Sequence, residues 1–375
     1  MFETIGKSEG PPVVICGGRG GVGKTTLSAA IALRGAFAGQ RTVLLGVDPD
    51  RRLAELLWED GGKAGPPKAG PFKATLPGAG APKGELHVMP VDAKRVFDGM
   101  IERHASGDAR QRMLSNRYYR HLSENMPGTQ EYMALEALCQ ARMQGEWDLI
   151  VLDAPFARGA IDFLDAPERI LDLLGHPYFM KLLKPGSRGG KLGGMMFGFI
   201  ANPVHKAVSQ VIGREALDEL VEFFSLFHAF LLDGFQKRAK TIQALLASPA
   251  TAFVAITTPL PGPVREAVAF KNHLRQRGMR FHGFIVNRVH RLDNLPDPAA
   301  PPEPHGVSGL AAPEIADSLE TAYERYYGLM KQDEKWVHRL REETGPGAGL
   351  VVVPLADSDI ADMEGLIRIL PCLGG

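Results

Sequence analysis

A glycine-rich loop near the start of the chain constrains the fold more than any other feature. Residues 17–26 read GGRGGVGKTT and stand between the β-branched run 13–15 and the stretch 27–38, whose small residues favour a helix. The loop satisfies G-x-x-x-x-G-K-[ST], a pattern in which backbone N–H groups wrap an anion at the positive end of the following helix. The sequence therefore predicts a strand, a phosphate-binding loop and a helix in direct succession.

The loop supplies most of the candidate nucleotide-binding residues. Lys24 is expected to reach the β- and γ-phosphates, and Thr25 is expected to hold Mg²⁺. The other candidate positions are Gly18, Arg19, Gly20, Gly21, Val22, Gly23 and Thr26. The alternative interpretation is a glycine-rich turn, but the flanking strand and helix favour phosphate binding.

Short apolar runs recur along the chain and predict an α/β fold. They occupy residues 13–16, 42–47, 149–152, 252–256, 283–286 and 350–353. Nearly continuous Val, Ile and Leu runs are typical of strands buried on both faces of a parallel sheet. We expect a mostly parallel, twisted sheet flanked by helices. Segments 61–84 and 295–313 are rich in glycine or proline and predict surface loops or disordered insertions.

Two aspartates stand directly after two of these runs. Asp48 follows residues 43–47, and Asp153 follows residues 149–152. Because ligands of open parallel sheets bind at the carboxyl ends of the strands, both carboxylates are expected at one phosphate site. One would hold Mg²⁺ and the other would orient the attacking water. Taken singly, each aspartate also fits a helix cap or a turn.

Composition narrows the functional class. Lysine plus arginine and aspartate plus glutamate both number 43, so no global basic field favours nucleic acid or an anionic membrane surface. The start, MFETIGKSEGPP, lacks the pattern of a signal peptide, and no apolar stretch approaches the roughly 18 residues of a membrane span. We therefore expect a cytoplasmic protein without stable membrane insertion.

The loop and several later segments resemble a known family. The loop is similar to the deviant Walker A motif K-G-G-x-G-K-T-[TS] of dimeric ATPases, with Arg19 in the place of the signature lysine. The segments that carry the wider resemblance are GVDPDRRLAELL, PGTQEYMALEAL, WDLIVLDAPFARGAIDFLDAP, FVAITTPLPGPVRE and GFIVNRVH. In this order, over residues 12–370, they resemble the ArsA family of anion-transporting ATPases. That family includes the guided-entry ATPases for tail-anchored membrane proteins.

The resemblance implies catalytic and metal-binding roles. Lys24 and Arg19 would serve catalysis, and the Arg19 guanidinium would cross a dimer interface to the partner's nucleotide. Asp48 would be the switch I residue that positions water, and Asp153 would be the Walker-B-like residue near Mg²⁺. The predicted metal-binding residues are therefore Thr25, Asp48 and Asp153. A solvated loop arginine is the alternative interpretation of Arg19.

The resemblance also implies an adenine site. Asn287 would read the edge of the base, with Pro354 and Leu355 beside it. Amide chemistry independently supports Asn287, because an amide donates and accepts in one plane and so matches the N6 and N7 edge of adenine. A strand-end turn is the alternative interpretation of this asparagine.

The sequence departs from the family at two motifs. Residues 153–159 read DAPFARG where relatives show D-A-P-x-T-G-H, and residues 50–52 replace the usual small residue and histidine. Together with Arg19, these changes are compatible with a slow or partner-dependent ATPase.

The cysteines argue against two functions of the family. Metalloid activation needs converging thiolates, and a zinc-clasped homodimer needs a C-x-x-C pair. Neither spacing occurs among Cys16, Cys139 and Cys372. We expect Cys16 and Cys139 to be buried apolar side chains, so a metalloid role is disfavoured.

Helical patterns between the nucleotide motifs predict a client-facing layer. Residues 217–235 carry an apolar stripe at three-and-four spacing, and a methionine-bearing stretch, 193–200, precedes it. The client-surface candidates are Met195, Met196, Phe197, Phe199, Phe224 and Phe227. The pattern favours plain core packing of the helical layer, and a groove for an apolar helix or a partner subunit is the other interpretation.

These patterns predict one ATPase domain with an inserted α-helical subdomain. The nucleotide core is expected at residues 10–91, 146–166 and 250–375, and the helical subdomain at 92–145 and 167–249. We expect an Mg²⁺-dependent, ATP-binding homodimer, or a heterodimer with a related ATPase, whose closing and reopening control a hydrophobic client. Two alternatives stay open: a catalytically weak regulatory subunit of a heterodimer, and a partition or positioning ATPase.

Overall fold

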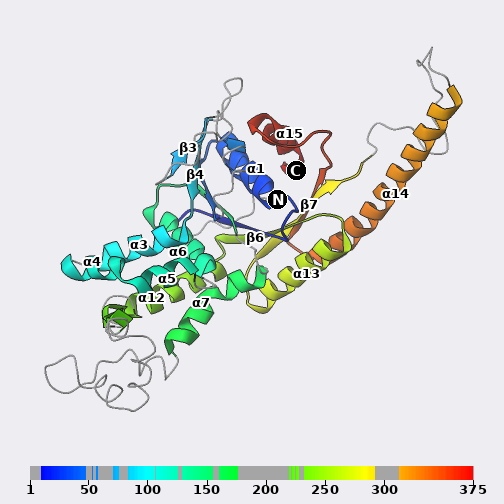
Figure 1. Ribbon diagram of the computed structural model, residues 1–375. Helices are drawn as coiled ribbons and strands as arrows, with labels where there is room; N and C mark the ends of the chain where they lie inside the picture. Colours follow the sequence, from blue (N-terminus) through cyan, green and yellow to red (C-terminus); the bar gives the residue numbers. More distant parts are fainter. Residues whose placement is uncertain are drawn as a thin grey trace, which may run out of the picture.

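The computed structural model contains one eight-stranded sheet with helices on both faces (Figure 1). The structure describes residues 10–47, 53, 56–57, 71–75, 83–105, 107–125, 129–154, 160–175, 219–220, 222–223, 225–227, 232–291 and 312–374.

The strands run parallel except at one edge. Their order is β3-β4-β2-β5-β1-β6-β7-β8, and only β3 and β4 pair in the antiparallel direction. Their bounds are β1 Val13–Gly17, β2 Arg41–Gly46, β3 Phe72–Lys73, β4 Glu85–Pro90, β5 Leu149–Asp153, β6 Thr251–Thr257, β7 Phe281–Val289 and β8 Gly349–Pro354. The predicted α/β class with a mostly parallel sheet is confirmed. The six apolar runs coincide with β1, β2, β5, β6, β7 and β8, except that Val47 follows the end of β2.

Strands β3 and β4 extend the sheet beyond the predicted runs. The composition of residues 61–84 predicts a surface loop or insertion, which is wrong for Phe72 and Lys73, because both pair with β4. β4 reads ELHVMP and alternates polar with apolar side chains, as a strand at a half-covered edge does. Cross-strand pairing, rather than local composition, places these two strands.

Helices cover the two faces of the sheet unequally. α1 and α15 lie on one face, and the other helices lie on the opposite face or at its end (Figure 1). Their bounds are α1 Lys24–Phe37, α3 Ala93–His104, α4 Gly107–Ser115, α5 Arg117–Asn125, α6 Thr129–Gln144, α7 Ala160–Gly175, α12 Leu232–Ala247, α13 Pro261–Gln276, α14 Ala312–Thr344 and α15 Met363–Leu373.

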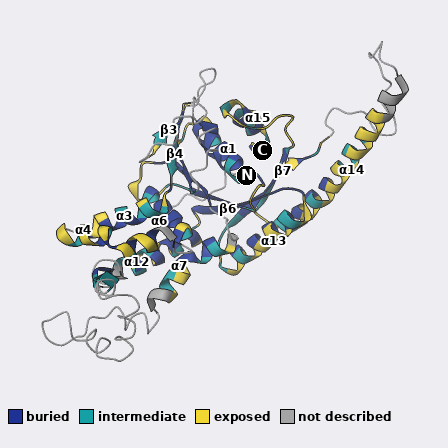
Figure 2. Cartoon of the chain, viewed as in Figure 1, coloured by how far each residue is buried: buried dark blue, intermediate teal, exposed yellow. Residues whose placement is uncertain are grey.

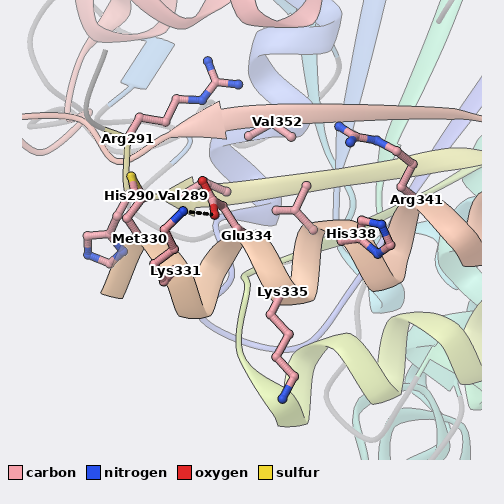
Figure 3. A pocket seen from close by; sticks show the side chains of 11 residues that line it. Val289, His290, Arg291, Met330, Lys331, Glu334, Lys335, His338, Arg341 and Val352 are labelled. Carbon is pink, nitrogen blue, oxygen red and sulfur yellow. Dashed lines mark hydrogen bonds and ion pairs between the residues drawn. The ribbon is translucent and has the colours of Figure 1, made fainter. Parts of the chain in front are cut away.

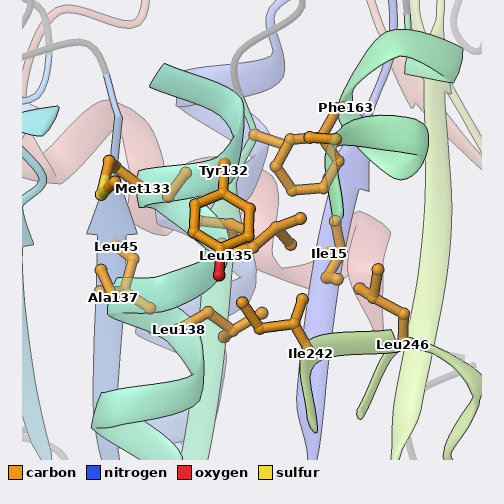
Figure 4. Close-up of a cluster of buried hydrophobic side chains, with 14 of the residues drawn as sticks. Ile15, Leu45, Tyr132, Met133, Leu135, Ala137, Leu138, Phe163, Ile242 and Leu246 are labelled. Carbon is orange, nitrogen blue, oxygen red and sulfur yellow. The ribbon is translucent and has the colours of Figure 1, made fainter. Parts of the chain in front are cut away.

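Side chains of the central strand β1 lie in the hydrophobic cores on both faces of the sheet. Val13 and Ile15 face the layer of α6, α7 and α12, whereas Val14 and Cys16 face α1 and α15, because successive strand side chains point to opposite faces. Figure 4 shows Ile15 packed among side chains of α6 and α12. The sheet is accordingly buried on both sides over its centre (Figure 2), and this rigid centre carries the loop that follows β1.

The helical layer encloses one of the predicted client-surface residues. Phe227 is buried, with its ring 5.5 Å from that of Phe223 and 5.9 Å from that of Phe235. Its position therefore matches core packing inside the layer rather than an exposed client surface. The other candidates, Met195, Met196, Phe197, Phe199 and Phe224, lie outside the described residues.

Candidate functional site

The glycine-rich loop joins the end of β1 to the start of α1, as predicted from its flanks. Two of its glycines are required by close contacts. A Cβ at Gly18 would lie 2.1 Å from the carbonyl oxygen of Ile256, and a Cβ at Gly23 would lie 2.3 Å from Nδ2 of Asn287. Gly23 is also the N-cap of α1 in the left-handed conformation, with φ of 90°. The loop thus fits tightly against β6 and β7.

Asp153 meets the first turn of α1. The Thr25 hydroxyl donates to Oδ2 of Asp153 at 2.7 Å, and the Ser28 hydroxyl donates to Oδ1 at 3.1 Å. The carboxylate is nearly buried, with 9% of the residue exposed. β1 and β5 pair with Cys16 opposite Asp153, which sets this position. The structure therefore brings two of the predicted metal-binding residues together and adds Ser28, which the motif analysis missed.

The chemistry of this cluster suits Mg²⁺. Hydroxyl and carboxylate oxygens are the ligands that this cation prefers, and it is usually held by one or two protein groups together with phosphates and water. Across the described part of the chain, no group of three or more His, Cys, Asp or Glu side chains forms a metal cage. A site shared between Thr25, Asp153 and a bound phosphate fits both observations. Asp48, the third predicted metal-binding residue, lies outside the described residues.

Lys24 places a partly buried ammonium at the loop. Its Nζ donates to the Arg19 carbonyl at 3.2 Å. Burial lowers the pKa of Lys24, and the nearby Asp153 carboxylate opposes that shift. An anion beside this ammonium would offset the cost of burying its charge.

Arg19 is paired within its own chain. Its Nη1 lies 3.1 Å from Oε1 of Glu266 on α13, and both side chains are more than half exposed. Nη1 also lies close to Gly262, where a Cβ would be 3.1 Å away. The guanidinium of Arg19, which was predicted to cross a dimer interface, therefore contacts α13 of its own chain. Glu266 is a second residue that the sequence patterns did not indicate.

Asn287 and Arg288, at the end of β7, both contact the loop. Asn287 is nearly buried, and its Nδ2 donates to the Val22 carbonyl at 2.9 Å. The exposed Arg288 donates from Nη1 to the Gly21 carbonyl at 3.2 Å. The amide nitrogen of Asn287 is thus engaged by the loop itself. Arg288 did not stand out in the sequence. The signal that could have pointed to it is its place directly after Asn287 at the end of a predicted strand.

Pro354 and Leu355 lie at the same edge of the sheet as Asn287. Pro354 ends β8 opposite Val289, and the Leu355 amide donates to the Val289 carbonyl at 2.9 Å. The Leu355 side chain is exposed. These residues therefore flank the end of β7 from the neighbouring strand.

Two cysteines are buried as predicted. Burial raises the pKa of the Cys16 thiol to about 12 and that of Cys139 to about 11. Thiols with such values are poor nucleophiles and poor metal ligands at neutral pH, because both roles need the thiolate.

A cavity of about 950 Å³ opens where α14 crosses β7 and β8 (Figure 3). Arg291, Lys331 and Arg341 line it, and the Lys331 ammonium pairs with Glu334 at 3.0 Å. Its lining residues include none of the candidates named from the loop.

Among the helices that the structure describes, none is both long and apolar enough to cross a membrane.

Comparison with known proteins shows one matching family and several similar ATPases. The anion-transporting ATPase family, ArsA, matches residues 12–298. ATPase ARSA1 of Chlamydomonas reinhardtii is 26% identical over 315 residues, which cover 77% of this chain and 36% of the algal protein. A protein of Aquifex aeolicus provisionally named arsenical pump-driving ATPase 2 is 24% identical over 283 residues, which cover 74% of this chain and 80% of that protein. ATPase get3 of Aspergillus terreus is 27% identical over 214 residues, which cover 56% of this chain and 55% of the fungal protein.

The chain thus spans 36% of the algal relative and 55% of the fungal one. The family match includes the loop, Asp153 and Asn287, and it extends over most of the chain. The chain therefore belongs to the ArsA family of anion-transporting ATPases.

Proposed function

We propose that this protein binds ATP at residues 17–26 and hydrolyses it to ADP and phosphate in an Mg²⁺-dependent reaction. The observation that carries the proposal is the hydrogen bond of 2.7 Å between Thr25 and Asp153. It joins the metal-binding hydroxyl of a phosphate loop to a nearly buried carboxylate at a strand end, the two protein groups that an Mg²⁺–phosphate complex needs. Membership of the ArsA family supports the same activity.

Different residues of the chain would bind the phosphates, hold the metal and position the attacking water. The loop N–H groups and Lys24 would bind the phosphates, and Thr25 and Asp153 would hold the metal. Bound Mg²⁺ would neutralise charge that develops on the phosphates. Asp48, by its resemblance to switch I residues, would orient the attacking water.

The test is ATP turnover in three variants. Lys24→Ala and Asp48→Asn should each lower the rate at saturating ATP by about 100-fold or more, because they remove charge stabilisation and water positioning. Arg275→Ala, on the exposed end of α13, should match the unaltered protein. Unchanged turnover in both of the first two variants would remove the assignment.

We also propose that the protein works as a cytoplasmic dimer that controls a hydrophobic client. The nucleotide core would comprise residues 10–91, 146–166 and 250–375, and the helical subdomain would comprise 92–145 and 167–249. The resemblance to the guided-entry ATPases supports this proposal. Light scattering of the Asp48→Asn variant should give twice the mass of one chain in the presence of ATP and Mg²⁺. A mass of one chain both with and without ATP would contradict the proposal.

One observation favours a second function, that of a catalytically weak regulatory subunit. Arg19 is bound to Glu266 of its own chain, so the cation expected to act in trans is occupied in cis. If this reading holds, the isolated protein should bind ATP with little turnover, and a related ATPase should raise the rate on mixing. A high rate for the protein alone would exclude it.

A further inference from the structure

The backbone of Arg288 is in an unusual conformation. Among the described residues, it is the only one other than glycine with positive φ, at 59°. For a residue with a Cβ this left-handed conformation is unfavourable, because the Cβ comes too close to the backbone carbonyl oxygen. The pairing of β7 with β8 also shifts register between Val286 and Val289, so Arg288 lies in an irregular strand end. Such irregularities re-aim side chains and are held in place by surrounding contacts.

The contacts that hold this conformation come from two sides. The Val289 carbonyl accepts from the Leu355 amide at 2.9 Å. The His290 amide donates to Oδ2 of Asp333 on α14 at 2.8 Å, and the His290 ring lies 2.7 Å from the same oxygen. Figure 3 shows His290 beside α14, just after β7 ends. The chain after Arg288 is therefore fixed to β8 and α14.

The strained residue and its neighbour hold two successive carbonyls of the loop. Arg288 donates to the Gly21 carbonyl, and Asn287 donates to the Val22 carbonyl. A peptide unit is planar and trans, so its C=O and N–H point in opposite directions. Drawing these two carbonyls toward β7 turns the N–H groups of Val22 and Gly23 the other way. A phosphate-binding loop needs N–H groups turned inward in this manner.

We propose that Arg288 is a positioning residue that sets how long the loop retains a nucleotide. This inference rests on the proposed function and adds a residue to that site. The guanidinium would keep the Gly21 peptide in the orientation that binds phosphate, and the strained backbone would aim it there. Loss of the guanidinium should therefore speed nucleotide release, with a smaller effect on turnover at saturating ATP.

The test measures dissociation of mant-ADP by stopped flow, together with KM and kcat. Arg288→Ala should release mant-ADP about tenfold faster or more, the size expected for one charge-assisted hydrogen bond, and should raise KM more than it lowers kcat. Arg288→Lys keeps a charged donor and should stay within about threefold of the unaltered protein. Arg275→Ala, an exposed arginine on α13 away from the loop, is the matched control.

Arg288→Gly separates the donor from the backbone. Glycine adopts φ of 59° freely, so this variant should keep or raise the melting temperature. It lacks the donor, so it should release mant-ADP as fast as Arg288→Ala does. Release at the unaltered rate in both the Ala and Gly variants would overturn the role of Arg288. Failure of the unaltered protein to bind mant-ADP would instead overturn the proposed function.

Discussion

The hydroxyl of Thr25 lies 2.7 Å from Oδ2 of Asp153, although the two residues stand 128 positions apart in the chain. The parallel pairing of β1 with β5 brings them together, because it sets Cys16 opposite Asp153 and so places the loop after β1 beside the end of β5. Ser28 completes the contact from the next turn of α1. The proposed metal-binding part of the site is therefore a junction between one helix and one strand.

Ser28→Ala should weaken Mg²⁺ binding without removing it. The Ser28 hydroxyl donates to Asp153 at 3.1 Å, and partners that orient a metal ligand typically contribute about 10- to 100-fold in affinity. Titration of Mg²⁺ in the ATPase assay should show the apparent affinity reduced by that factor. Thr344→Ala, which removes a hydroxyl bonded only within α14, serves as the control. Equal Mg²⁺ dependence in the Ser28 variant and the control would show that Ser28 does not act on the site.

Gly20 and Gly23 should differ sharply in their tolerance of alanine. A Cβ at Gly23 would lie 2.3 Å from Nδ2 of Asn287, and φ there is 90°. Gly23→Ala should therefore destabilise the protein by about 1–3 kcal/mol and separate Asn287 from the loop. A Cβ at Gly20 meets no atom within 4 Å, so Gly20→Ala should change the free energy of unfolding, measured with urea, by no more than about 0.5 kcal/mol. Similar midpoints for the two variants would contradict the close packing of Gly23 on β7.

Glu266→Gln should free Arg19 at little cost in stability. The pair is more than half exposed, and such pairs contribute about 0–1 kcal/mol. The melting temperature should therefore hardly change, whereas turnover should rise if Arg19 acts across a dimer interface. Adding Arg19→Ala to Glu266→Gln should abolish that rise. A rate that is insensitive to Glu266 would show that the cis pair does not restrain catalysis.

Glu136 should make folding stability depend on pH. Burial raises the pKa of this carboxyl above its ordinary value of 4.5, and Arg238 and Arg103 oppose the shift. The Arg238 Nε lies 3.3 Å from Oε1 of Glu136. The folded state then binds the proton more tightly than the unfolded state. The stabilisation is complete below pH 4.5 and is lost as the pH rises through the folded pKa.

The comparison is between the unaltered protein and Glu136→Gln, by urea unfolding between pH 4.5 and 7.5. The glutamine variant cannot titrate at this position, so the unaltered protein should lose stability relative to it as the pH rises. Curves that stay parallel over this range would mean that the carboxyl has an ordinary pKa in the folded state.

Features that depend on residues close together in the chain could be predicted before the fold was known. The phosphate-binding loop is recognised together with the strand before it and the helix after it, and these three segments all lie within residues 13–38. The apolar runs predict strands for the same reason, since burial on both faces requires consecutive apolar side chains. Asp153 was identified because it ends such a run. These local patterns predicted the α/β class and most of the candidate nucleotide-binding residues.

Which distant residues meet depends on the order of the strands in the folded sheet. Asn287 reaches Val22 across 265 positions because β7 lies beside β6, and β6 lies beside β1. The apolar runs are alike in composition, so their spacing in the chain does not encode this order. Arg288, Ser28 and Glu266 were missed because their roles come from a contact rather than a pattern. An exposed arginine, a helical serine and a helical glutamate are ordinary in sequence, and they gain meaning only once the sheet has placed the loop beside them.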